Sequence, residues 1–507
     1  MSKAAKSAII LFIATITSKS LGFVRDLIIA SVYGAGTVSD SYIASLNIIT
    51  VAFIGLFCVA IQSTFMPIFA NIQENKNIDK AFDFTGNVIN IIMVISIFAS
   101  ILGFVFTKPL VKLFAYGFQG DRLILTIQLT KILMFSIGVV AITYILKAYL
   151  ELNDYFLITG IMPLPYNVSI IFSVLLSKKF GVSMLGYGTL FAFIIQMIFL
   201  VPFCLRSGFK YKFNFNIKDP NIKSMAISIL PILIGASANQ VNNLVDKNLA
   251  SIFPDGAFSA LNYGYKLNIF VTGLFVASIT SVMYPMFSRL VANENIKKLK
   301  TSLATAINTV TLVTVPLSIG AIVLSQPIIR VLFERGQFTR ENTILTANVL
   351  IFYSIGMLAS GIRDVLVIAF YSLQDTKIPM KNSIICVGFN ICFDLILINY
   401  FKAPGLAFAT SISSIISVIF LMYSLKKKIG NLHAKSMLIT FFKTAACGLV
   451  MAFVVYNVYN FLGEMKEIFA LAISILIGAI VYSILAVLFK VDSVDYFVSI
   501  IKGKLKR

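Results

Sequence analysis

Three charged side chains lie inside an apolar stretch near the start of the sequence. The segment "SKSLGFVRDLIIASVYGAG" (18–36) carries Lys19, Arg25 and Asp26. A charge at the centre of a bilayer costs roughly 2.5 kcal/mol or more, so a membrane helix keeps it only where it faces protein or water. Lys19 and Asp26 are nearly in register on a helix, and Arg25 is displaced by about 100° from Asp26. The pattern indicates a cationic cavity wall that binds an anion, or an Arg–Asp pair that only braces the helix.

Another cation, Lys266, lies in the apolar segment "LNYGYKLNIF" (261–270). One interpretation is that it faces the same cavity as the cations of the first segment. The other is that its ammonium group extends toward a membrane surface.

Two further segments place carboxylates and amides inside apolar stretches. Asp246 lies in "NQVNNLVDKNLA" (239–250), and Asn390 and Asp394 lie in "VGFNICFDLIL" (387–397). The i, i+4 spacing of Asn390 and Asp394 puts both on one face of a helix. Two carboxylates with amide and hydroxyl oxygens favour a small hard cation, and Na⁺ suits a transporter better than Ca²⁺, which takes more oxygens. A structural hydrogen-bond network and a proton relay are the alternatives.

The composition indicates that these residues lie on transmembrane helices. Of the 507 residues, 58% are hydrophobic and 12% are charged, about half the charge of a soluble protein. Apolar stretches of about 20 residues, each long enough to cross the bilayer, recur along the whole chain. We therefore predict an all-α polytopic membrane protein with about fourteen transmembrane helices.

The distribution of basic residues predicts the orientation. The net charge is +21, and Lys and Arg concentrate in alternate loops and in the C-terminal tail. This asymmetry follows the positive-inside rule and predicts both termini in the cytoplasm. It accounts for the positive charge without nucleic acid as a partner. The basic segments are 206–218, 288–300, 426–435 and 502–507.

No residue pattern favours an enzyme. The sequence has five cysteines without a CxxC spacing, one histidine, no P-loop and no GxSxG motif. We expect a transporter that needs no catalytic residues and no cofactor, apart from a coupling ion.

The sequence repeats itself at an offset of about 220 residues. Three segments recur in the same order: 66–80 as 284–298, 108–118 as 326–338, and 148–154 as 369–375. The offset spans six predicted helices, so the two halves keep one membrane orientation. This predicts two parallel six-helix lobes around a central cavity, an arrangement typical of transporters. We assign 1–215 to the N-terminal lobe, 216–430 to the C-terminal lobe, and 431–507 to helices 13 and 14 with a cytoplasmic tail.

Several motifs resemble the MurJ/MviN family of lipid II flippases, within the multidrug/oligosaccharidyl-lipid/polysaccharide exporter superfamily. The resemblance covers essentially the whole chain. It implies fourteen helices, alternating access, a bacterial cytoplasmic membrane and a lipid-tail groove formed by helices 13 and 14. The implied substrate is lipid II, undecaprenyl pyrophosphate bearing a disaccharide-pentapeptide, and the implied partners are membrane lipids and the cell-wall synthesis machinery. The motifs are "LGFVRDLIIASVYGAG" with "SDSY" (21–42), "LFERGQFT" (332–339), "AFYSLQDTKIPMKNS" (369–383) and "GLAFATSIS" (405–413).

The resemblance also assigns roles to individual residues. It places substrate-binding cations at Lys19, Arg25 and Lys266, with Asp26 as the acidic partner. It places the ligands of a sodium site at Asp246, Asn390, Asp394 and Thr410, with the backbone carbonyl of Leu406.

The chain departs from the family pattern in its cations. No arginine stands near Phe53–Ile54, Ile269 replaces an acidic residue, and Lys19 and Lys266 stand where arginines are usual. Lysine binds phosphate as a point charge rather than as a bidentate fork. Because of these departures, one alternative is that the protein is a paralogue that moves another undecaprenyl-linked glycan. A cation-coupled small-molecule antiporter and a non-transporting scaffold are further alternatives.

Overall fold

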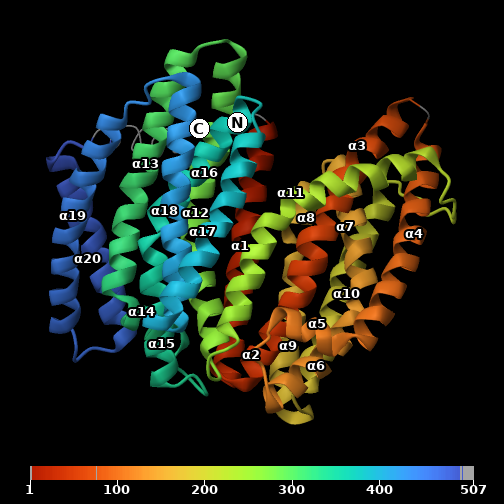
Figure 1. The fold of residues 1–507 in the computed structure, drawn as a ribbon, viewed down its shortest axis with the longest axis horizontal. Coiled ribbons are helices and arrows are strands. Elements are labelled where there is room, and N and C mark those ends of the chain that lie inside the picture. The colour runs from red at the N-terminus through yellow and green to blue at the C-terminus, as the bar shows by residue number, and fades with distance from the viewer. Residues whose placement is uncertain (1–2, 76, 492–493, 495–507) are drawn as a thin grey trace. The chain divides into compact units, whose positions relative to one another are not determined.

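The computed structural model describes residues 3–75, 77–491 and 494, and most of these residues are helical (Figure 1). No strand occurs among them. The basic tail 502–507 lies outside the described residues. The helices are α1 (Lys3–Tyr33), α2 (Thr37–Asn47), the π-helical segment η1 (Ile48–Cys58), α3 (Val59–Asn75), α4 (Ile78–Val105), α5 (Thr107–Phe114), α6 (Gly120–Met134), α7 (Ser136–Leu152), α8 (Phe156–Ile161), α9 (Pro163–Phe180), α10 (Ser183–Arg206), α11 (Pro220–Ala250), α12 (Ala257–Ala292), α13 (Ile296–Val323), α14 (Ser325–Phe333), α15 (Arg340–Ile355), α16 (Met357–Ser372), α17 (Lys377–Phe401), α18 (Ala403–Ile429), α19 (Ala434–Phe461) and α20 (Glu467–Leu488).

The described helices confirm a polytopic membrane protein. Ten spans are long and apolar enough to cross a membrane, and twelve if each of two bent pairs is one span. Helices α1 and α11 each have 31 residues, or about 46 Å of rise. They are not counted among these spans, because the side chains of 3–13 in α1 and of 234–239 in α11 lie outside the described part of the structure. The total of fourteen spans therefore stays a prediction.

The internal repeat is visible in the helices. The helix pair α6 and α7 is bent by 47° at Phe135, and the pair α15 and α16 is bent by 43° at Gly356. Each bent pair follows a short helix, α5 in the first half and α14 in the second. The same sequence of elements recurs at the offset that the sequence predicted.

The first compact unit comprises Met1–Ser259 with Gly336–Phe338. Its core contains an aromatic cluster. The ring centroids of Phe69 and Tyr149 lie 5.7 Å apart, and those of Phe65 and Phe84 lie 5.8 Å apart. Helix α11 packs against η1, α3 and α5, so it belongs to this unit although the repeat assigns it to the second half. The division into 1–215, 216–430 and 431–507 stays a prediction.

The second compact unit comprises Ala260–Arg335 and Thr339–Arg507. Within it α17 packs on α18, and α19 packs on both α13 and α20. Tyr482 of α20 is buried and donates a hydrogen bond to the Leu312 carbonyl of α13, 2.8 Å away. The two C-terminal helices are thus attached to this unit through α13.

Candidate functional site

Arg25 and Asp26 form an ion pair inside the first unit. The Arg25 Nη2 lies 2.9 Å from Asp26 Oδ1, and the Arg25 side chain is 12% exposed. Its Nη1 donates to Asn167 Oδ1 of α9 at 3.0 Å, and the guanidinium lies 6.0 Å from the Tyr166 ring. The guanidinium is therefore held by α1 and α9 together. Asp26 and Asn167 both accept hydrogen bonds from this guanidinium.

Lys19 lies further back on α1 in a different environment. Its side chain is exposed and lines a cavity of about 390 Å³ with residues of α7 and α8. Lys147 and Glu151 of α7 line the same cavity. The sequence reasoning missed Lys147, although a Lys–Glu pair at i, i+4 inside an apolar stretch was a signal for it.

Lys266 lies on α12 in the second unit and is half-buried. The proposed substrate-binding residues therefore belong to both units. The structure brings Arg25 and Asp26 together, and it holds Lys266 on a separate compact unit.

Four proposed sodium ligands lie on two packed helices of the second unit. Asn390 and Asp394 of α17 are fully buried, and Asn390 Nδ2 donates to Asp394 Oδ2 at 2.7 Å. On α18, Thr410 Oγ1 donates to the Leu406 carbonyl at 3.0 Å. Carboxylate, amide, hydroxyl and carbonyl oxygens are the ligands that a hard cation prefers. The donor set therefore fits Na⁺.

The fifth proposed ligand, Asp246, lies on α11 in the first unit. It is buried, and Asn242 Nδ2 donates to its Oδ2 at 3.4 Å. No group of three or more His, Cys, Asp or Glu side chains placed to hold a metal occurs among the described residues. The acidic ligands predicted for the ion are thus divided between the units.

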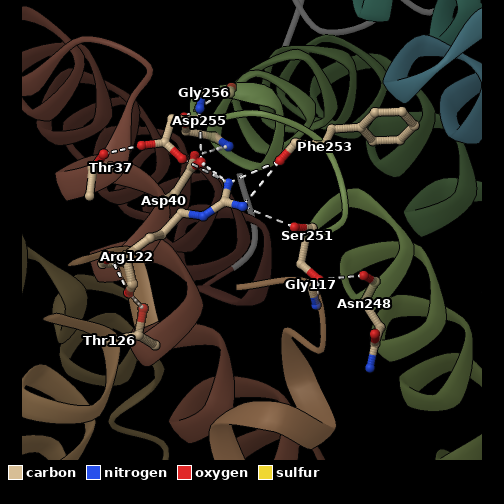
Figure 2. Close-up of polar contacts among 12 residues, drawn as sticks. Thr37, Asp40, Gly117, Arg122, Thr126, Asn248, Ser251, Phe253, Asp255 and Gly256 are labelled. Carbon is tan, nitrogen blue, oxygen red and sulfur yellow. Dashed lines mark hydrogen bonds and ion pairs between the residues drawn. The ribbon is translucent and has the colours of Figure 1, made fainter. Parts of the chain in front are cut away.

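An unpredicted charge cluster surrounds Arg122 in the first unit (Figure 2). Arg122 Nη1 lies 3.2 Å from Asp40 Oδ2 of α2 and 3.3 Å from Asp255 Oδ1. The guanidinium also donates to the carbonyls of Ser251 and Phe253, each at 3.1 Å. One buried arginine therefore binds α2 and the segment that follows α11.

Asp40 completes this cluster from α2. Its carboxylate is fully buried and accepts hydrogen bonds from the backbone N–H groups of Gly256 and Ser259, both at 2.8 Å. These donors belong to the start of α12, where backbone N–H groups lack partners within the helix. The cluster fixes the first turn of α12 to α2 and α6.

Asp375, at the end of the segment "AFYSLQD", forms an ion pair within the second unit. Its carboxylate pairs with Lys428 and accepts a hydrogen bond from the Ile378 N–H at 3.2 Å. The hydrogen bond from Lys428 holds the pKa of Asp375 below its usual value. The pair links the start of α17 to the end of α18.

The pair makes a pH-dependent contribution to stability. Because the pKa of Asp375 is lowered on folding, its contribution is present above about pH 4, the pKa of an unperturbed aspartate, and is lost as the pH falls through the folded value. We expect Asp375→Asn to lower the apparent melting temperature slightly at pH 7 and to match the parent in strong acid. A melting-temperature difference that grows on acidification would contradict this assignment.

Comparison with known proteins places the chain among membrane transporters. The family model "Lipid II flippase MurJ" matches residues 29–476. The chain belongs to the MurJ family. The family consists of transporters, which confirms the prediction of a transporter rather than an enzyme.

Individual MurJ relatives span most of the chain. The "Probable lipid II flippase MurJ" of Buchnera aphidicola subsp. Baizongia pistaciae is 29% identical over 424 residues, 82% of each protein. The protein of that name from Vibrio cholerae is 28% identical over 429 residues, again 82% of each. That of Rickettsia prowazekii is 26% identical and covers 97% of this chain and 98% of its own length.

Solved structures agree with the MurJ assignment. A structure described as "Lipid II flippase MurJ, inward closed conformation" has a TM-score of 0.82 and 28% identity, and the match covers 98% of this chain and 100% of the other. An inward-facing MATE family transporter has a TM-score of 0.67 at 14% identity and covers 84% of this chain. The second match shows the fold alone.

Proposed function

We propose that this chain is a lipid II flippase that moves undecaprenyl-pyrophosphate-linked peptidoglycan precursor from the inner to the outer leaflet of the cytoplasmic membrane. The observation that carries the proposal is the match, over nearly its full length, to a solved lipid II flippase. The retained cations of α1 support it, because the substrate's diphosphate is anionic.

Arg25 and Asp26 suit a substrate that must bind and leave again. A diphosphate has more negative charge than one carboxylate and accepts bidentate hydrogen bonds from a guanidinium. It can therefore displace Asp26 from Arg25, and Asp26 can reclaim Arg25 when the headgroup departs. We propose that Lys266 contributes a further positive charge from the second unit during alternating access.

We propose that Na⁺ binding at Asp246, Asn390, Asp394, Thr410 and the Leu406 carbonyl resets the transporter. A buried carboxylate in a membrane helix is costly unless a cation or a proton neutralises it. The ion must bind one conformation more tightly than the other to drive the cycle. The internal repeat supports a cation at Asp246. Asp246 of α11 follows Asp26 of α1 by about 220 positions, which is the repeat offset, and the carboxylate of Asp26 binds a cation, the guanidinium of Arg25.

The orientation and partners follow from the same proposal. We propose a bacterial cytoplasmic membrane with both termini in the cytoplasm, in agreement with the basic loops 206–218, 288–300 and 426–435. The isoprenoid tail of the substrate would remain in lipid along α19 and α20. Membrane lipids and cell-wall synthesis enzymes are the expected neighbours.

A specific observation favours one alternative substrate. Segment η1 carries no charged residue, so the arginine that the family places near Phe53–Ile54 has no counterpart there. A less cationic binding site would suit an undecaprenyl-linked glycan with a different headgroup. Complementation distinguishes the two substrates, because it measures the exposure of lipid II itself.

Complementation tests the proposed function. In a bacterium depleted of its own lipid II flippase, we expect this chain to restore growth and the exposure of lipid II on the outer leaflet. Membrane expression is checked by immunoblotting, and an empty vector is the control. Good expression without any return of exposed lipid II would refute the lipid II assignment and favour another lipid-linked glycan.

A further inference from the structure

The cavity that Lys19 lines contains a second cation. It lies within the first unit, has a volume of about 390 Å³ and is formed by residues of α1, α7, α8 and α9. We call it the Lys19–Lys147 cavity after its two cations. Its lining residues are Thr15, Ser18, Lys19, Lys147, Glu151, Phe156, Thr159, Gly160 and Pro163.

Glu151 holds Lys147 in position. Lys147 Nζ lies 3.7 Å from Glu151 Oε1, and the side chains are 24% and 19% exposed. Glu151 Oε2 accepts a hydrogen bond from Gln62 Nε2 of α3 at 2.7 Å. Because ordinary hydrogen bonds to nitrogen donors are 2.7–3.2 Å long, the ammonium–carboxylate pair is loose, whereas Glu151 is firmly fixed. A stronger acceptor can therefore draw Lys147 toward the cavity without displacing Glu151.

The cavity has a defined wall of hydroxyl groups. Ser18 Oγ donates to the Gly160 carbonyl at 2.8 Å and thereby joins α1 to α8. Thr159 Oγ1 donates to the Phe156 carbonyl at 3.1 Å. These two hydroxyl protons are used by backbone carbonyls, and the lysines are the cationic donors of the lining. Each ammonium group has three donors.

The charge balance of the cavity favours an anion. Lys19 and Lys147 contribute two positive charges and Glu151 contributes one negative charge. Arg25 lies six residues beyond Lys19, about 9 Å along the helix, and is occupied by Asp26 and Asn167. Lys19 and Lys147 thus line the cavity, whereas the guanidinium of Arg25 is held by Asp26 and Asn167.

We propose that Lys19 and Lys147 form a subsite for a phosphate or diphosphate group, with Glu151 positioning Lys147 until the anion arrives. The proposal rests on the proposed function, in which the transported lipid carries a diphosphate. The proposed subsite assigns Lys147 of α7 to substrate binding, whereas segment η1 of this chain has no cation. The phosphate chemistry is shared by a prenyl diphosphate, an anionic phospholipid and free diphosphate.

Binding to the purified full-length protein tests the subsite. In an uncharged maltoside detergent, the probes are undecaprenyl diphosphate, phosphatidylglycerol and inorganic diphosphate, and affinity is measured by native mass spectrometry and by thermal shift. We expect Lys147→Gln to weaken binding of undecaprenyl diphosphate about tenfold, the usual scale for a lost charged hydrogen bond. Lys147→Arg keeps the charge and should retain binding. Glu151→Gln should tighten binding, because it removes the competing carboxylate.

The control and the outcomes separate this proposal from the flippase function. Lys179→Gln neutralises an exposed lysine at the end of α9 and should change nothing. The probe whose affinity depends on Lys147 identifies the source of the phosphate. Equal affinities of Lys147→Gln and Lys179→Gln for all three probes overturn the subsite, even if the parent complements. Lys147-dependent binding in a parent that fails to complement leaves the subsite standing and rejects the flippase function.

Discussion

Replacing Arg122 with leucine is expected to destabilise the first unit by about 3 kcal/mol or more, the usual cost of leaving one partner of a buried ion pair uncompensated. The substitution leaves the fully buried carboxylate of Asp40 without its cation and the carbonyls of Ser251 and Phe253 without a donor. The apparent melting temperature of the purified protein should fall by about 5 °C or more. Differential scanning fluorimetry in detergent measures it.

A double variant makes this prediction specific. Asp40→Asn removes the buried charge, so Asp40→Asn with Arg122→Leu should be destabilised by less than the sum of the single variants. Arg206→Gln, at the exposed end of α10, is the control and should remain within a degree of the parent. Additive effects of the two single variants would show that Arg122 and Asp40 act independently.

Sequence reasoning located the intramembrane charges but not their partners. A charged residue in an apolar stretch must face protein or water, and this rule alone singled out Lys19, Arg25 and Asp26. The i, i+4 spacing of Asn390 and Asp394 correctly predicted a shared helix face. Arg25 also binds Asn167, which lies 142 residues away, and no local periodicity can predict such a contact.

The residues that the sequence reasoning missed lie near the ends of helices or in long-range clusters. Asp40 lies in the motif "SDSY", but nothing in the local sequence links it to Arg122 or Asp255, and only tertiary packing brings the three side chains together. Segment η1 is purely apolar, so nothing in its composition distinguishes a π-helix from an α-helix. Gly336 adopts φ +62°, and an added Cβ would lie 2.1 Å from the Ser31 carbonyl oxygen. The motif "LFERGQFT" thus contains a glycine that a close backbone contact requires.

Asp26 and Asp394 are buried carboxylates with different partners, and this difference leads to the sodium proposal. Asp26 is neutralised by the adjacent Arg25 on its own helix. Asp394 receives the amide of Asn390, a neutral donor that orients a carboxylate without cancelling its charge. An exchangeable cation at Asp394 would allow that charge to be neutralised in one conformation and exposed in another.

Replacing Asp394 with asparagine is expected to abolish the sodium dependence of transport and to lower activity tenfold or more at saturating sodium. Asparagine has nearly the same shape and can still accept from Asn390, so the packing of α17 on α18 and the expression level should persist. The loss of the anionic ligand removes most of the attraction for a hard cation. Lipid II exposure is measured in the depleted strain, or in proteoliposomes, as sodium replaces potassium at constant ionic strength. Glu341→Gln, an exposed carboxylate at the start of α15, is the matched control and should keep the parental sodium response. If the parent and Asp394→Asn have equal activity at every sodium concentration, the ion does not couple to transport through this site.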